Sequence, residues 1–113
     1  MISTKIYKIL ESENINVNKL SADNEYELEW YSEAGEDMID YITADNDREF
    51  VTAYRTIALN FDADEHAEMW VSMRGTRGVP RSIRELINDA DGTQDFYDKV
   101  GDKLLDAIKE VER

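Results

Sequence analysis

The sequence predicts an α+β fold in which an N-terminal helix and an antiparallel β-hairpin are followed by about four helices packed on the hairpin. Two observations carry this prediction. Apolar and polar residues alternate within residues 25–43, whereas apolar residues recur every three or four positions before and after that segment. The 113 residues, 42% of them apolar, suffice for one core and not for two, so we expect residues 1–113 to form a single compact acidic domain.

The N-terminal segment predicts a short amphipathic helix. Isoleucine and leucine recur at helical spacing through the first ten residues, Ser3 or Thr4 is available as an N-cap, and the pattern ends near Asn14. We expect the apolar stripe of this helix to face the core.

The β-hairpin is predicted between residues 25 and 43. Over residues 25–31 each glutamate is followed by a large apolar residue or tyrosine, which is typical of a half-buried strand. Residues 32–37 supply turn chemistry, and residues 38–43 form the returning strand. An isolated hairpin is marginally stable in water, so its apolar face is expected to pack on the later helices.

Four further helices are predicted after this hairpin. Three of them begin with a polar cap that is followed three residues later by glutamate. These pairs are Asn46 and Glu49, Asp62 and Glu65, and Ser82 and Glu85. Gly75 is expected to end the second of these helices and to open a glycine-rich loop. Gly92 is expected to end the third, with Thr93 capping the last helix.

The net charge of −13 at pH 7 is the main functional signal. Such a surface repels nucleic acid and attracts basic grooves. Alternate strand residues project from one side about 7 Å apart, a spacing close to that of neighbouring phosphates in one DNA strand. We therefore predict an acidic partner-binding face that mimics a phosphate row; the alternative is a strand face that is charged because it is solvated. The face comprises Glu25, Glu27, Glu29, Glu33, Glu36, Asp37 and Asp40.

Residues 70–84 depart from this acidity, with four arginines and no acidic residue. Guanidinium groups and the amides of a helix N-terminus both favour phosphate or carboxylate, so these arginines form a candidate anion-binding site. The alternative is an internal ion-pair network with the 26 acidic residues of the chain. The pattern matches neither a P-loop nor a dinucleotide fingerprint. The arginines are Arg74, Arg77, Arg81 and Arg84.

No motif predicts catalysis, a metal or a cofactor. The chain has no cysteine, and His66 is its one histidine, so thiolate sites and a two-histidine zinc site within the chain are excluded. Asp45 opens a segment that begins like a calcium loop, but Phe50 stands where such loops need glycine. With no signal peptide and no apolar run long enough to cross a membrane, we expect a cytoplasmic, non-enzymatic protein that has no cofactor or membrane contact.

Four segments resemble a family of small acidic proteins carried by phages and mobile elements of gut bacteria. They are residues 31–37, 61–70, 74–80 and 82–86. The resemblance implies an inhibitor of host defence, of the anti-CRISPR or DNA-mimic anti-restriction type, and it brings no catalytic residues. Together with the acidity, it predicts a protein that occupies the basic nucleic-acid-binding groove of a host nuclease or its complex, in the bacterial host cytoplasm, without binding nucleic acid directly.

Two alternative functions, and the possibility of a homodimer, stay open beside this prediction. The chain is a binding module for a small anion or nucleotide if the arginines are its working surface, and a structural adaptor of a mobile element if it has no antagonist role. It forms a homodimer if the edge of the hairpin is open, because unpaired backbone groups there would pair with a second chain.

Overall fold

The computed structural model describes residues 2–77 and 82–112, which contain a three-stranded antiparallel sheet and four helices. In chain order the elements are α1 (Thr4–Ser12), β1 (Asn16–Lys19), β2 (Glu25–Tyr31), β3 (Asp37–Thr43), α2 (Asp47–Asn60), α3 (Ala63–Arg77) and α4 (Ile83–Glu112). The predicted α+β class is confirmed, and the order of a helix, strands and later helices holds in outline. Within the described residues, one strand is added and the later helices number three, not four.

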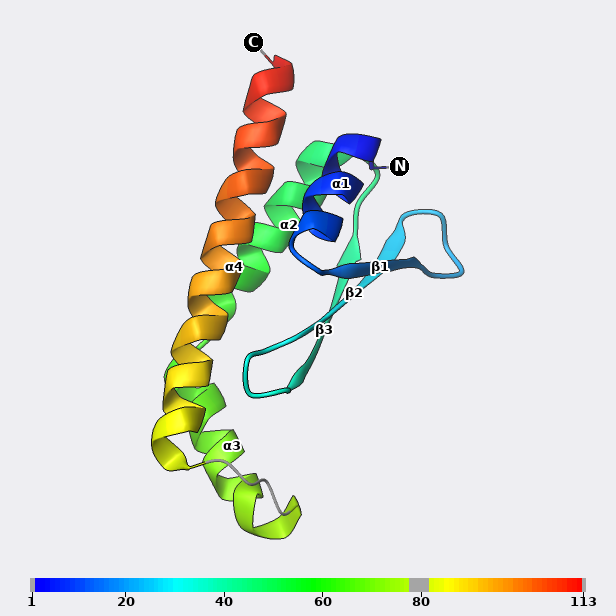
Figure 1. Ribbon diagram of the computed structural model, residues 1–113. Coiled ribbons are helices and arrows are strands. Elements are labelled where there is room, and N and C mark those ends of the chain that lie inside the picture. The colour runs from blue at the N-terminus through cyan, green and yellow to red at the C-terminus, as the bar shows by residue number, and fades with distance from the viewer. Residues whose placement is uncertain (1, 78–81, 113) are drawn as a thin grey trace.

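Helix α4 is the long axis of the molecule (Figure 1). Its 30 residues span about 45 Å at ~1.5 Å per residue, which is close to the 49 Å length of the molecule. α1, α2 and α3 all contact α4, and α3 lies at the end opposite the C-terminus (Figure 1). Among the described residues, no helix combines the length and the apolar content that crossing a bilayer requires.

The sheet has the order β1-β2-β3, so the acidic strand β2 is central. The predicted alternation in β2 is confirmed, because Tyr26, Leu28 and Trp30 are buried and the glutamates face the other side. β1 was not predicted, since Val17 is the one apolar residue in its four. Asn14, with a φ of 61°, turns the chain after α1 so that β1 pairs with β2.

The core lies between the inner face of the sheet and the helices. Trp30 of β2 packs against Phe96 of α4, with ring centroids 4.2 Å apart. Tyr26 meets Phe50 of α2 edge to face, with centroids 5.6 Å apart. Aromatic residues of the central strand therefore join the sheet to two helices.

The three predicted pairs of a polar cap and a following glutamate are all confirmed, whereas Ser3 makes no side-chain cap hydrogen bond at the start of α1. The amide of Glu49 donates to Oδ1 of Asn46 over 2.9 Å, and the amide of Glu65 donates to Oδ1 of Asp62 over 3.1 Å. At the start of α4, the amide of Glu85 donates to Oγ of Ser82 over 3.2 Å. The last pair is reciprocal, because the Ser82 hydroxyl donates to the Glu85 carboxylate.

Both helix ends predicted at glycines are wrong. α3 continues through Gly75 to Arg77, and α4 continues through Gly92. Thr93, predicted to cap a separate last helix, therefore lies inside α4. In α4, the residues of the buried stripe keep the same helical spacing on both sides of Gly92, so ending the helix there would expose half of them. The ~1 kcal/mol cost of a glycine inside a helix is smaller than the cost of that exposure. The stripe consists of Leu86, Ala90, Thr93, Tyr97, Val100, Leu104 and Ala107.

Candidate functional site

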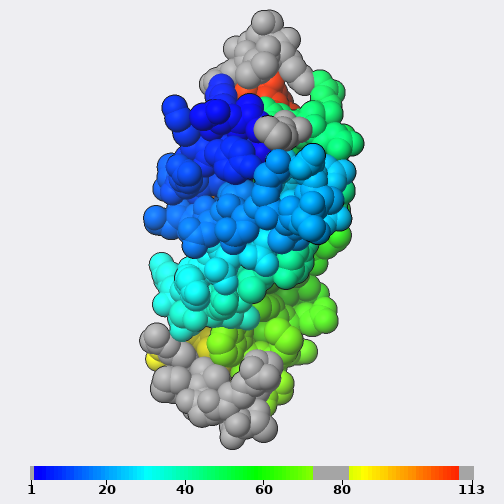
Figure 2. Space-filling view, turned by 90° about the vertical axis from the view of Figure 1, so that its right-hand side faces the viewer, coloured from blue at the N-terminus to red at the C-terminus, as the bar shows by residue number. Residues whose placement is uncertain are grey.

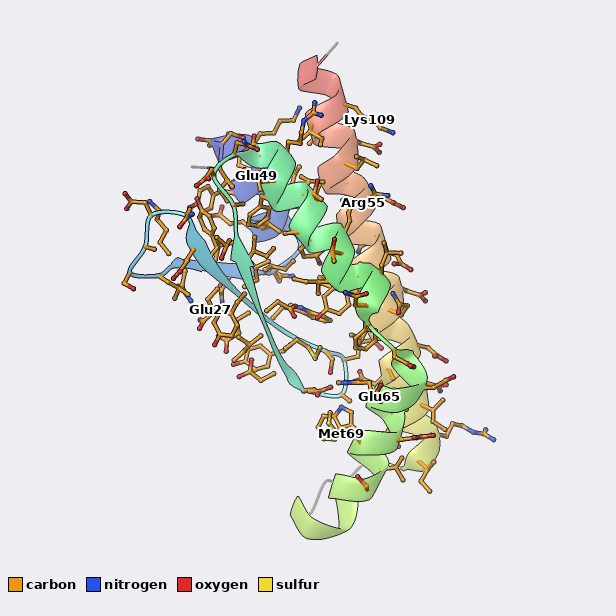
Figure 3. All side chains as sticks on the ribbon, turned by 180° about the vertical axis from the view of Figure 1, so that it is seen from behind. Glu27, Glu49, Arg55, Glu65, Met69 and Lys109 are labelled. Atoms are coloured by element: carbon orange, nitrogen blue, oxygen red, sulfur yellow. The ribbon has the colours of Figure 1, made fainter. Side chains whose placement is uncertain are left out.

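The face of the sheet that points away from the helices is the candidate site, and we call it the outer sheet face. Figure 2 looks onto the side that carries the sheet, where the strands form the middle of the surface, and Figure 3 shows Glu27 extending away from α4. Strand register assigns ten residues to the outer sheet face. They are Asn16, Asn18, Glu25, Glu27, Glu29, Tyr31, Asp37, Ile39, Tyr41 and Thr43.

The structure brings Glu25, Glu27 and Glu29 together in one row along the middle of this face. Each is half-buried between neighbouring strands, and Nδ2 of Asn18 donates to Oε1 of Glu27 over 3.2 Å. The three strands lie wholly within the described residues, and the one basic side chain among them is Lys19, which pairs with Tyr26 and so belongs to the opposite parity. No basic residue of the three strands therefore shares the face of the row.

Negative charge is concentrated where β2 and β3 approach their turn. A hydrogen bond between the carboxyl groups of Glu29 and Asp37 raises the pKa of Glu29, and burial and the charges of Asp37 and Glu27 add to the rise. The charges of Asp37 and Glu29, followed by burial, raise the pKa of Tyr31. This end of the outer sheet face resists further negative charge and would be stabilised by a cation.

Three large exposed side chains accompany the carboxylates. Tyr31 is 62% exposed, Tyr41 is 64% exposed and Ile39 is 42% exposed. Tyr41 lies directly across from Glu27, and Ile39 lies across from Glu29. Exposed tyrosine beside charged groups is typical of protein-binding surfaces. The sequence put Ile39 and Tyr41 on one strand face, but it held no signal that this face is the uncovered one.

Asp40 does not belong to the outer sheet face, and its inclusion in the acidic face was wrong. It lies across from Leu28 on the inner face, where the hydroxyl of Tyr97 donates to its Oδ2 over 2.7 Å. Burial raises the pKa of Asp40, and the Tyr97 hydrogen bond opposes the rise. The physical reason is the alternation of the strand, which gives Asp40 the parity of Met38 and Ile42.

Glu33 and Glu36 lie in the turn between β2 and β3, outside the carboxylate row. Glu33 is exposed. Oε2 of Glu36 instead lies 2.5 Å from Nε2 of His66 and accepts a hydrogen bond from the indole of Trp70. Glu36 thus connects the turn to α3. Sequence reasoning missed this contact, because it joins residues 30 and 34 positions apart.

The predicted arginine site is divided between two helices. Arg74 and Arg77 lie in the last turns of α3, where the glycine-rich loop was expected, so that loop prediction was wrong. Arg84 lies exposed in the first turn of α4. Arg81 lies outside the described residues. The helical backbone up to Arg77 removes the flexible turn on which the predicted anion site depended.

Within residues 2–77 and 82–112, no group of three or more histidine and acidic side chains is arranged to hold a metal ion. Comparison with known proteins gives no match, whether with family models, with curated proteins or with solved structures. The resemblance to proteins of phages and mobile elements therefore stays a prediction, and the functional argument depends on the geometry of the chain.

Proposed function

We propose that this protein is a non-enzymatic inhibitor whose outer sheet face occupies the basic nucleic-acid-binding groove of a host nuclease or its complex. The observation that carries the proposal is the row of Glu25, Glu27 and Glu29 on an uncovered central strand, whose face includes no basic residue of the three strands. Such a target would place the protein in the cytoplasm of a bacterial host.

The spacing of the row supports mimicry of a nucleic-acid strand. Side chains two residues apart on a strand are about 7 Å apart, so lysine and arginine side chains that contact successive phosphates would meet successive carboxylates. The interaction of Glu29 with Asp37, which raises the Glu29 pKa, would be relieved by such a cation. The target would therefore stabilise the charges that repel one another in the free protein.

The exposed tyrosines add stacking contacts to the electrostatic attraction of the carboxylates. Tyr31 and Tyr41 offer exposed rings beside the carboxylates, and arginine guanidinium groups stack on aromatic faces. A groove for nucleic acid commonly combines basic side chains with stacking groups, which is the composition that this face complements.

The test compares inhibition by two variants of equal charge. The first is Glu25→Gln, Glu27→Gln and Glu29→Gln. The control is Glu11→Gln, Glu68→Gln and Asp102→Asn, which removes three exposed charges from helices. Purified CRISPR effectors and restriction endonucleases cleave their DNA substrates in the presence of each protein. We expect the native protein to inhibit a member of this panel, with potency that falls as salt rises.

We expect the strand variant to lose about tenfold or more in potency, since each charge-assisted contact contributes ~1.5 to 3 kcal/mol, and we expect the control to inhibit like the native protein. Equal losses in the two variants would assign the effect to net charge and not to the row. Absence of inhibition across the panel, with folded protein, would reject the proposal.

A further inference from the structure

A hollow of about 390 Å³ lies where the turn between β2 and β3 meets α4. The rings of Trp30 and Phe96, which pack against each other at a tilt of 33°, line it, as does Gly92 of α4. Three acidic residues, Glu13, Glu33 and Asp89, complete the charged part of the lining, which includes no lysine, arginine or histidine. The lining is thus aromatic and acidic.

The Asp89 carboxylate is buried and only half satisfied. The residue is 7% exposed, and its Oδ1 accepts a hydrogen bond of 2.8 Å from the amide of Ala34. Its Oδ2 is buried without a hydrogen-bond partner among the described residues, and it is closed off from the space inside the hollow. Buried carboxylate oxygens are normally paired, so Asp89 gains a hydrogen bond if its side chain turns toward a donor in the hollow.

Glu13, which lines the same hollow, shows what kind of group pairs with a carboxylate there. Lys99 lies 3.0 Å from one of its oxygens, and Lys103 donates to the other. The ammonium group of Lys99 also lies over Phe96, 5.5 Å from the ring centroid. An ammonium group held between a carboxylate and an aromatic face therefore already exists at one side of the hollow. Among the residues that the structure describes, Asp89 Oδ2 has no equivalent partner.

We propose that this hollow binds an organic ammonium or guanidinium group, which lies against the Trp30 and Phe96 rings and pairs with Asp89 once the Asp89 side chain turns toward the hollow. Its volume is at the lower end of ligand sites, which suits a short aliphatic cation or one side chain. Two sources share this chemistry, a free amine and a lysine or arginine side chain of a protein partner. The proposal does not depend on the inhibitor function, because its residues lie outside the carboxylate row.

The experiment is a titration followed by ¹H–¹⁵N NMR. The cationic probes are butane-1,4-diamine and N-acetyl-arginine methylamide, and the controls are 1-butanol and butyrate. We expect saturable shifts at the amides of Ala34, Asp89 and Gly92 with a cationic probe, and none with the controls. Response to the diamine assigns the site to free amines, whereas response to the arginine derivative alone assigns it to a protein side chain.

Two variants make the test specific. Asp89→Asn keeps an acceptor for the Ala34 amide and removes the charge, and we expect it to weaken binding about tenfold or more. Gly92→Leu fills the hollow and should abolish binding, while Gly92→Ala is its control, because a Cβ there meets no atom within 4 Å. If Asp89→Asn does not fold, the Gly92 pair decides.

Absence of saturable shifts in the native protein overturns the proposal. So do shifts of equal size in the native protein and Asp89→Asn, or unchanged binding in Gly92→Leu. Shifts spread over the acidic surface, with none concentrated at the hollow, would mean that the cations screen net charge without occupying a site.

Discussion

The hydroxyl of Tyr97 donates a hydrogen bond of 2.7 Å to the carboxylate of Asp40, which joins α4 to the inner face of β3. Burial raises the pKa of Asp40. Burial and the nearby Asp40 charge also raise the pKa values of Tyr97 and Tyr54, and the Tyr54 hydroxyl is buried without a partner among the described residues. The core thus contains a carboxylate whose ionised form is disfavoured.

We predict that Asp40→Asn stabilises the protein at neutral pH. A folded pKa above the ordinary value of 3.8 means that the folded chain holds the proton more tightly than the unfolded chain. The stability of the native protein therefore falls as the pH rises through the raised pKa. The variant lacks this loss and keeps an acceptor for Tyr97. Urea unfolding between about pH 4 and pH 8 should show its advantage growing with pH; lower stability throughout would contradict the prediction.

Glu13 should show the opposite dependence on pH. Hydrogen bonds from Lys103 and Lys99 lower its pKa from 4.5, so this contribution to stability is present above about pH 4.5 and is lost as the pH falls through the lowered pKa. Glu13→Gln should reduce the free energy of unfolding at pH 7 by at most about 1 kcal/mol, because both lysines are half exposed. Glu11→Gln, on the exposed side of α1, is the matched control. Equal effects of the two changes would show that the lysine pair contributes nothing specific.

Alanine substitution should have opposite effects on stability at Gly92, which lies in a helix, and at Gly35, which lies in a turn. Gly92 lies inside α4 with open space where a Cβ would stand, so Gly92→Ala should stabilise the protein by up to about 1 kcal/mol. Gly35 has a φ of 87° in the turn between β2 and β3, so Gly35→Ala should destabilise it by about 1 kcal/mol. Thermal unfolding of both variants checks the opposite signs, and destabilisation by Gly92→Ala would indicate that α4 is not continuous.

Local signals in the sequence were sufficient for the helix starts and for the central strand. The capping pairs at Asn46, Asp62 and Ser82 act within one turn, and the alternation over residues 25–31 lies within a single element. The continuity of α4 was also present in the sequence, since its buried stripe crosses Gly92 without a change of phase. Reading glycine as a helix end gave a single residue more weight than the burial of the whole stripe.

Other features have no local signal. β1 contains one apolar residue and exists because it pairs with β2. The hydrogen bond from Trp70 of α3 to Glu36 connects segments that are distant in the chain. The parity of Asp40 was readable from its apolar neighbours Met38 and Ile42, but its Tyr97 partner, 57 residues away, was not. The carboxylate row could be predicted from one strand, whereas its uncovered state required the whole fold.

The last prediction concerns Glu36 and the anchoring of α3. Among the α3 side chains that the structure describes, Ala67 is the one that is buried, so packing holds this helix weakly. Glu36 binds both His66 and Trp70 from the turn between β2 and β3. Glu36→Ala should therefore lower the free energy of opening α3 by about 1 to 2 kcal/mol. Amide hydrogen exchange in α3 should become faster, while β2 and the middle of α4 keep their protection. Glu33→Ala, in the same turn, should leave α3 unchanged. Unaltered exchange in the Glu36 variant would show that contacts with α4 alone hold α3.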